Sequence, residues 1–255
     1  MFSVIRFFIL GATVTTVFTL NAFAGDLKQP HSWEGLHVGF SIGGAYGNAD
    51  SNYDVIDEGA YFVPGDPEQL GGLFNRKIDG QSLTGAFIAG YDFQRDNITY
   101  GIETDLTVMD FSETEGVRDV AYDTQPGTLF NQQNKIESKF MLSLRPKVGY
   151  AMGKALFHFS AGPSIGKFKY SSQFSDGNGA TTSFSDSKIA LGLSSGLGVN
   201  YMVGDGWSLR GDYLFSYFPD IVDGKSALSN DAQNGFKYDA DFQSHNLRFG
   251  LTKRF

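Results

Sequence analysis

Large apolar side chains alternate with small or polar ones in eight segments of the chain. Between Gly35 and Gly47, for example, Leu36, Val38 and Phe40 share one parity, while the residues between them are small or polar. Successive side chains of a strand point to opposite faces of a sheet, so a period of two predicts strands with one apolar face each. We therefore predict an all-β fold, an eight-stranded antiparallel barrel. The segments span residues 35–47, 82–93, 98–110, 139–150, 155–170, 188–202, 207–218 and 242–255.

The connections between these segments alternate between short and long. The short ones are the tight turns QRDN, MGK and VGDG. The long ones fall near residues 48–81, 111–138, 171–187 and 219–241, and they are acidic. Outer-membrane barrels have short periplasmic turns and long extracellular loops, so this asymmetry favours a transmembrane barrel.

The small residues of the sixth segment indicate which face lies inside. A soluble barrel, such as a lipocalin, would bury its apolar face and expose the other one. Here the other face carries Ala190, Gly192, Ser194 and Gly196, which weaken an exposed strand but fit a narrow lumen. Aromatic residues also gather near the short turns, as in the interfacial girdles of membrane barrels. We predict such interfacial positions for Trp33, Tyr150, Tyr201 and Trp207.

Charged residues fall on the face opposite the apolar one, as Arg145 and Lys147 do in KFMLSLRPKVGY. Four basic side chains facing lipid would cost about 2 to 4 kcal/mol each, which rivals the whole stability of a domain, about 5 to 15 kcal/mol. We predict a charge network in the lumen, with Glu103 and Asp105 pairing across strands with Arg145 and Lys147. It serves either to pack the interior or to conduct or gate ions. The predicted members are Glu103, Asp105, Arg145, Lys147, Arg210, Asp212 and Arg248.

The first residues have the pattern of a secretory signal. Arg6 precedes an apolar run over residues 7–20, and Ala22-Phe23-Ala24 fits a signal-peptidase site. The expected parts of the chain are a cleaved signal peptide (1–24), a short periplasmic lead (25–34) and the barrel (35–255).

Composition argues against several other classes of protein. The formal net charge is −8 and no Lys/Arg cluster is present, which argues against a nucleic-acid partner. The absence of cysteine excludes a disulfide framework. The four histidines stand on separate segments without neighbouring motifs, and SDGNG at 175–179 lacks EF-hand spacing. We expect no catalytic residue, no metal site and no cofactor, and hence no enzyme.

Five stretches carry a resemblance to a known family. They are WEGLHVGFSIGGAYG (33–47), GAFIAGYDFQ (85–94), YGIETDL (100–106), RPKVGYA (145–151) and GLGVNYMVGDGWSLRGDYLF (196–215). The chain resembles the small Gram-negative barrels typified by outer membrane protein A and the opacity surface antigens, often labelled porin-family proteins. The resemblance implies a location in the cell outer membrane, surrounded by its lipid and lipopolysaccharide. Phe249, Leu251 and Phe255 resemble the signal that the outer-membrane assembly machinery recognises.

We expect a structural surface barrel that contributes to envelope integrity. An eight-stranded barrel encloses only enough space for its own side chains, which argues against a wide pore. The alternatives are a narrow porin-like channel, and a surface antigen, adhesin or haem-binding protein that acts through its extracellular loops.

Overall fold

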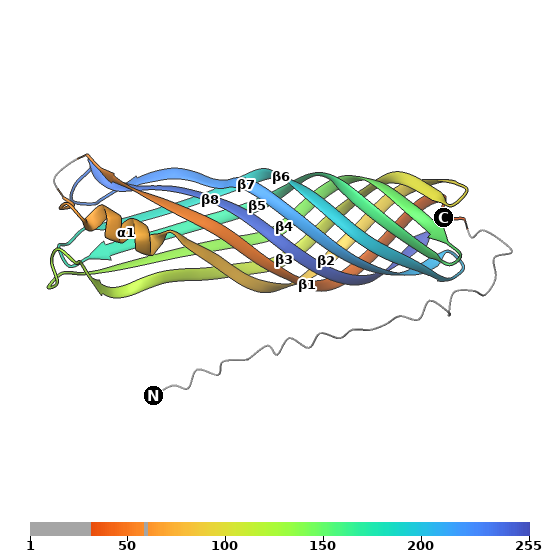
Figure 1. The fold of residues 1–255 in the computed structure, drawn as a ribbon, viewed down its shortest axis with the longest axis horizontal. Coiled ribbons are helices and arrows are strands. Elements are labelled where there is room, and N and C mark those ends of the chain that lie inside the picture. Colours follow the sequence, from red (N-terminus) through yellow and green to blue (C-terminus); the bar gives the residue numbers. More distant parts are fainter. Residues whose placement is uncertain (1–31, 59–60) are drawn as a thin grey trace, which may run out of the picture.

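The computed structural model describes residues 32–58 and 61–255 and shows a closed barrel of eight antiparallel strands (Figure 1). The predicted fold class is confirmed. The predicted signal peptide lies outside the described residues. A short helix, α1 (Asp66–Phe74), interrupts the connection between the first two strands. The strands are β1 (Gly35–Asp57), β2 (Arg76–Arg95), β3 (Ile98–Ala121), β4 (Leu129–Met152), β5 (Ala155–Asp176), β6 (Thr181–Gly204), β7 (Trp207–Ala227) and β8 (Asn234–Arg254).

The part of the barrel next to the short turns carries an outward apolar belt. Leu83, Ile42 and Leu191 are 85%, 71% and 69% exposed, which only a lipid environment makes favourable for residues of this kind. The belt ends at the tight turns, where Asp96 and Asp205 adopt positive φ angles of 54° and 48°. Within the described part of the chain, no helix is long and apolar enough to cross a membrane.

The strands continue well beyond the predicted segments, so the loops are much shorter than expected. The extracellular connections are reduced to residues 58–75, 122–128, 177–180 and 228–233. In the parts of the strands that extend beyond the predicted segments, the inward face is apolar and the outward face is polar. Tyr53 and Phe236 point inward and are buried, whereas Asn52 and Asp54 face outward and are exposed. The period remains two, but the polarity of the faces inverts because this part of the barrel stands in water instead of lipid.

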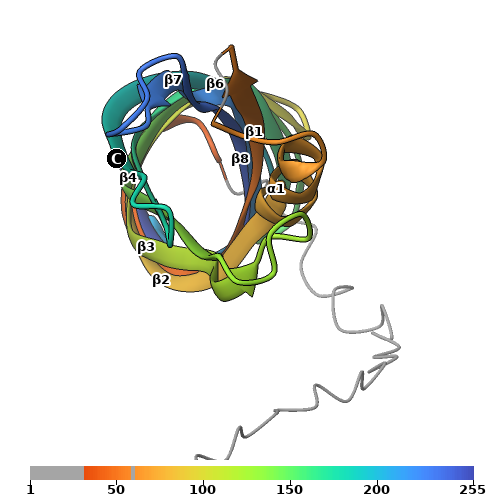
Figure 2. The ribbon, with the colours of Figure 1, turned by 90° about the vertical axis from the view of Figure 1, so that its left-hand side faces the viewer.

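The outer part is divided into two four-stranded sheets. Pairing between β2 and β3 ends at Thr84 and Met109, and pairing between β6 and β7 ends at Leu193 and Tyr217. Above these points, no ladder joins either pair among the described residues. One sheet therefore contains β7, β8, β1 and β2, and the other contains β3 to β6. Viewed from the extracellular end, α1 lies at the side of the barrel near β1 (Figure 2).

Helix α1 joins the two sheets at the β2–β3 seam. The side chain of Gln69 donates to the carbonyl of Ala121 at 2.9 Å and accepts from the amide of Asp123 at 3.0 Å. Thr124 donates to Asp66, the first residue of the helix, at 2.6 Å. At the other seam, Ser229 bonds to Thr181 and closes only the upper end.

Candidate functional site in the lumen

The lumen within the membrane contains a cluster of buried charged residues. Its predicted acidic members come from β3 and β7, and its predicted basic members from β4, β7 and β8. These seven residues are at most 6% exposed. The residues that the structure brings together here are Glu103, Asp105, Arg145, Lys147, Arg210, Asp212 and Arg248.

Glu103 is the centre of this cluster. Its carboxylate accepts two bonds from Arg210, at 2.7 and 2.8 Å, and one from Arg145 at 3.1 Å. The ammonium of Lys147 lies 3.4 Å away. Glu103 and Arg145 are direct cross-strand partners, whereas Arg210 reaches Glu103 from the far wall, so the cluster spans the lumen.

Asp105 and Asp212 extend the cluster on either side of Glu103. Arg248 contacts Asp105 through two bonds of 2.6 and 3.1 Å, and also donates to Thr107 at 2.9 Å. Asp212 accepts from the Nε of Arg210 at 2.5 Å. Bidentate contacts of this kind fix guanidinium groups in both position and orientation.

Four further residues belong to the cluster but were not among the predicted members. Asp92 contacts both Lys147 and Arg254 at 2.9 Å. His37 lies 3.3 Å from Glu103, and His158 lies 3.4 Å from Asp212. Each shares the inward parity of its strand, so the alternation that located the other members could have found them. Asp92 and Arg254 bring the cluster to four acidic and five basic residues, besides the two histidines.

The prediction of an interfacial position for Trp33 is wrong. Its side chain is 1% exposed and packs against Ala151 and Leu156 at the periplasmic end of the barrel. The guanidinium of Arg254 lies 5.6 Å from its ring. Trp33 precedes β1, and the chain turns inward there and covers the periplasmic end of the lumen. The other three predicted interfacial aromatics are exposed, Tyr150 by 49%, Tyr201 by 41% and Trp207 by 43%.

The residues of the predicted assembly signal lie on the outer face of β8 and at the end of the chain. Phe249 and Phe255 are 63% and 72% exposed, and Leu251 is partly exposed. Phe249 pairs with Ile42 of β1 and with Gly211 of β7. It is therefore part of the lipid-facing belt where the last strand closes the barrel.

A collar of hydroxyl and amide side chains lies above the charged cluster. Ser194 and Ser216 bond at 2.7 Å, and Thr84 donates to Asn246 at 3.1 Å. The void that the collar surrounds has a volume of only about 10 Å³, roughly the smallest space that holds one water.

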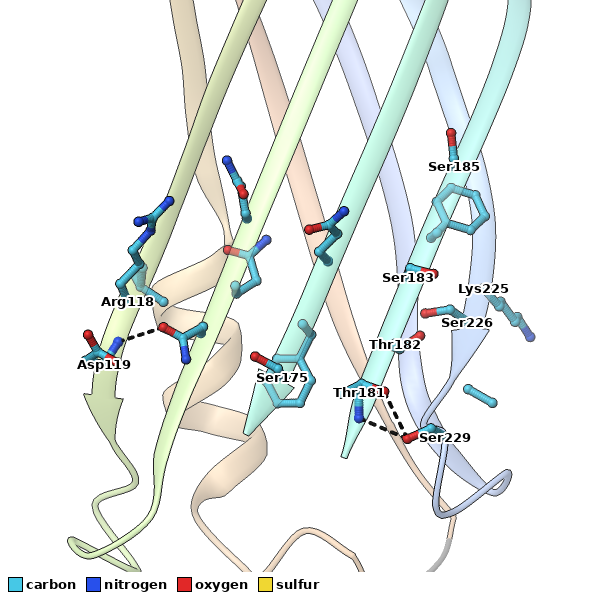
Figure 3. A pocket seen from close by; sticks show the side chains of 18 residues that line it. Arg118, Asp119, Ser175, Thr181, Thr182, Ser183, Ser185, Lys225, Ser226 and Ser229 are labelled. Atoms are coloured by element: carbon cyan, nitrogen blue, oxygen red, sulfur yellow. Dashed lines mark hydrogen bonds between the residues drawn. The ribbon is translucent and has the colours of Figure 1, made fainter. Parts of the chain in front are cut away.

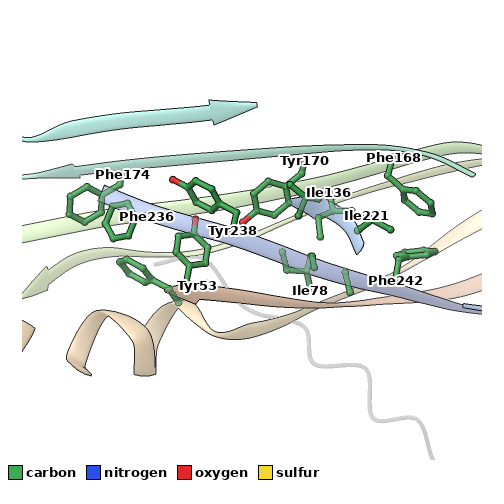
Figure 4. Close-up of a cluster of buried hydrophobic side chains, with 14 of the residues drawn as sticks. Tyr53, Ile78, Ile136, Phe168, Tyr170, Phe174, Ile221, Phe236, Tyr238 and Phe242 are labelled. Carbon is green, nitrogen blue, oxygen red and sulfur yellow. The ribbon is translucent and has the colours of Figure 1, made fainter. Parts of the chain in front are cut away.

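Aromatic and aliphatic side chains fill the outer part of the lumen, between the two sheets (Figure 4). We call this group the aromatic plug. At its inner end, Phe168 lies 5.1 Å from both Phe218 and Phe242, measured between ring centroids. At its outer end, Phe174 and Phe236 lie 4.9 Å apart. Its members include Tyr53, Ile78, Phe111, Phe130, Ile136, Phe168, Tyr170, Phe174, Phe218, Ile221, Phe236, Tyr238 and Phe242.

The first extracellular connection folds into the barrel mouth. Leu70 and Phe74 of α1 are buried in the aromatic plug. Nearby, Tyr61 and Tyr122 both donate to the carboxylate of Asp176, at 2.7 and 3.2 Å. Burial and the contact with this carboxylate raise the pKa of both phenols, because each phenolate would be desolvated beside a negative charge.

A larger cavity of about 1080 Å³ opens at the extracellular ends of β3 to β7 and includes the upper end of the β6–β7 seam (Figure 3). Most of its lining residues carry hydroxyl or amide groups, and Phe174 and Phe184 add apolar surface. Arg118, Asp119 and Lys225 are its charged residues. None of its 18 lining residues is the His, Cys, Met or Tyr that commonly ligates haem iron.

An outward apolar belt, short turns at one end and a filled polar lumen define an integral outer-membrane β-barrel. The sequence model of the outer membrane protein beta-barrel domain matches residues 10–255, and the chain belongs to this family. It is therefore a protein of the Gram-negative outer membrane.

Two relatives with similar sequences are also outer-membrane proteins. The 31 kDa outer-membrane immunogenic protein of Brucella melitensis is 27% identical over 96% of this chain and 98% of its own length. The 22 kDa outer membrane protein of Rhizobium leguminosarum is 28% identical over 74% of this chain and 66% of its own length. Among solved structures, the outer membrane protease OmpT of Escherichia coli aligns with a TM-score of 0.53 at 8% identity, over 87% of this chain and 97% of that chain. At this identity, the likeness to OmpT concerns the fold alone.

Proposed function

We propose that the protein is a structural surface barrel, which supports the outer membrane and does not conduct ions. The observation that carries this proposal is the filling of the lumen at three successive levels. These are the charged cluster, the collar with its void of about 10 Å³, and the aromatic plug. An ion would have to displace both ion pairs and packed aromatic rings.

The pairing within the cluster also favours a structural role over a conducting one. A selectivity site presents groups of one sign to a passing ion. Here the carboxylate of Glu103 already contacts Arg145, Lys147 and Arg210. Buried pairs of this kind add little net stability, but the loss of one partner leaves an uncompensated charge. The cluster thus fixes the register of the opposing strands across the lumen.

Planar-bilayer conductance tests this proposal. We expect no current steps from the wild-type barrel. Arg145→Ala/Lys147→Ala should also be silent, because the aromatic plug still closes the lumen. Phe168→Ala/Phe218→Ala/Phe242→Ala should likewise be silent, because the charged cluster remains. The five substitutions together should give no current either, because the collar, with its void of about 10 Å³, still closes the lumen.

The matched control is Ile42→Ala/Phe87→Ala/Phe249→Ala, which removes three lipid-facing side chains and leaves the lumen intact. Folding of each variant is checked by circular dichroism and by the mobility shift between heated and unheated samples in electrophoresis. Reproducible current steps from the folded wild-type barrel would refute the proposal and favour the narrow channel.

The proposal includes two partners and no catalysis. The exposed apolar side chains of β8, Phe249 among them, support recognition by the assembly machinery. The belt supports direct contact with outer-membrane lipid, including lipopolysaccharide in the outer leaflet. His37 and His158 both lie against carboxylates within the cluster, which supports a structural role for them and not a catalytic one.

The outer cavity favours surface recognition as a second candidate function. Hydroxyl and amide groups beside aromatic rings suit a neutral polar ligand such as a carbohydrate. A glycan array incubated with the folded barrel tests this. We expect any bound glycan to be lost on Phe184→Ala, and to be kept on Phe215→Ala, a substitution lower on β7 and outside the cavity. An array without signal would refute this candidate.

A further inference from the structure

Three exposed lysines lie together at the extracellular edge of the lipid-facing belt. Lys167 and Lys169 alternate on the outer face of β5, and Lys139 is the extra residue of a bulge in β4. Lys167 pairs with Phe140, one of the last apolar residues of β4 before the belt ends. We call Lys139, Lys167 and Lys169 the basic rim.

The basic rim keeps a positive charge after its neighbours are counted. Glu137 contacts Lys135 at 3.1 Å and Lys169 at 3.9 Å, so this group of three has one net positive charge. Within residues 32–58 and 61–255, Lys139 and Lys167 form no ion pair. The one other acidic residue at this level of β3 is Asp110, which is exposed and lies in the facing bulge.

The opposite side of the barrel has the reverse charge at the same level. Its strands carry an acidic set on their outer faces, in which Lys77 is paired with Asp50 at 3.5 Å. The charge difference follows the division of the outer part into two sheets. The acidic residues are Asp50, Asp79, Asp220, Asp239 and Asp241.

An apolar groove of about 320 Å³ runs down the wall beneath the basic rim. Leu142, Leu144, Pro163 and Ile165 line it. The groove coincides with a gap in the β4–β5 ladder, which is interrupted between the pairs Ser143–Ser164 and Lys147–Ser160. Pro163 lies in this gap, and proline lacks the amide hydrogen that a ladder needs.

We propose that the basic rim and this groove form one binding site for a phosphorylated glycolipid of the outer leaflet. Phosphate groups would bind Lys139, Lys167 and Lys169, and one acyl chain would lie in the groove. Lysine is suited to this place, because its apolar stem packs along the belt while its ammonium reaches the headgroup layer. This site gives the proposed contact with lipopolysaccharide a specific location, and the inference rests on that proposed contact.

The position of the basic rim beside an apolar groove favours a lipid over other phosphorylated ligands. A soluble phosphate ligand gains nothing from an apolar groove that opens toward acyl chains. A lipid without phosphate gains nothing from three ammonium groups. Only an amphiphile with both parts uses the whole site.

Native mass spectrometry of the full chain, expressed in Gram-negative cells and extracted in detergent, tests the proposal. The probes are bis-phosphorylated lipid A, its dephosphorylated form and inorganic phosphate. We expect wild-type protein to bind one lipid A, and to bind the dephosphorylated form at least about tenfold more weakly, since charge-assisted contacts to phosphate are lost. Inorganic phosphate at millimolar concentration should not displace the lipid.

Two variants and one control locate the site. Lys139→Gln/Lys167→Gln/Lys169→Gln should weaken lipid A binding by at least about tenfold. Leu144→Trp should weaken it by filling the groove, and as a lipid-facing change it should leave the fold intact. Lys77→Gln/Lys225→Gln/Lys237→Gln removes the same charge from the other sheet and should bind as wild type does.

The outcomes distinguish a failure of the proposed contact with lipopolysaccharide from a failure of the site. If wild-type protein binds no lipid A, the proposed contact with lipopolysaccharide fails and the site fails with it. If wild-type protein binds lipid A but the basic-rim variant binds it equally well, the contact stands and the site is wrong. Equal binding of the dephosphorylated lipid would also refute the site.

Discussion

At the residue scale, the lumen is organised around Glu103. Three cationic groups contact this one buried carboxylate, and no other residue of the cluster has as many ionic partners. Strand parity predicted its inward orientation and cross-strand pairing of Glu103 and Asp105 with Arg145 and Lys147. Parity could not predict Arg210 as a partner, because contacts across a lumen depend on the diameter and stagger of the barrel, which no single strand encodes.

The substitution Glu103→Gln should destabilise the barrel by about 3 to 5 kcal/mol, because it leaves buried cations without their counter-charge. Unfolding by urea in lipid vesicles measures this change. Glu137→Gln is the matched control, because Glu137 forms its ion pairs on the outer surface. This substitution should lower the free energy of unfolding by less than about 1 kcal/mol. Equal losses for the two variants would contradict a central role for Glu103.

Substitution of a glycine beside the charged cluster should also destabilise the barrel. A Cβ atom at Gly198 would collide with the carboxylate of Asp212 and the ring of His158. We expect Gly198→Ala to cost about 1 to 3 kcal/mol through overpacking, measured by the same unfolding assay. Gly85→Ala is the control, because nothing lies within 4 Å of its Cβ position. A Gly198→Ala barrel as stable as the control would show that the lumen has unused space.

At the element scale, the strands are longer than the sequence pattern predicted, and the reason is an inversion of polarity along each strand. The prediction required apolar residues on the outer face, which holds only where that face meets lipid. Beyond Tyr46, for example, β1 places Tyr53 inside and Asp54 outside. A search for alternation of either sign would have extended the strands. It would not have found α1, because Gly71 and Gly72 in its interior are weak helix formers.

Helix α1 should depend on two side chains for its position. Leu70→Ala/Phe74→Ala removes the residues that it buries in the aromatic plug, and each loss should cost about 2 to 5 kcal/mol of local packing. We expect faster hydrogen exchange and faster proteolysis over residues 66–75, with the membrane part unchanged. Glu68→Ala, an exposed change in the same helix, should leave both rates as they are. Unchanged rates in the double variant would mean that the hydrogen bonds of Gln69 and Asp66 hold the helix alone.

At the scale of the whole molecule, the barrel is one ring in the membrane and two sheets above it. The alternation of the sequence predicted the ring, its eight strands and the charges inside it. The division into sheets was not predictable, because the outer parts of β6 and β7 show no pattern that marks where their pairing stops. That boundary depends on how the aromatic plug holds the sheets apart, with Phe184 of β6 lying against Gly224 of β7.

The division should be visible in amide hydrogen exchange of the whole protein. Residues 182–188 of β6 have a ladder on one side only, whereas residues 132–137 of β4 are paired on both sides. We expect alternate amides of the β6 segment to exchange at least about tenfold faster than those of the β4 segment. Equal protection of both segments would show that the β6–β7 seam is closed in solution.

The two seams also bear on how far a local change in sequence affects strand pairing elsewhere in the barrel. A ring transmits every insertion or shift of register to all of its strands, since each strand is bonded on both sides. Above Thr84 and Leu193, each sheet has free edges, so a substitution or an added residue in one sheet is not passed to the other through a ladder. A local change at the extracellular end of one sheet can therefore leave the strand pairing of the other sheet, and of the ring in the membrane, unaltered.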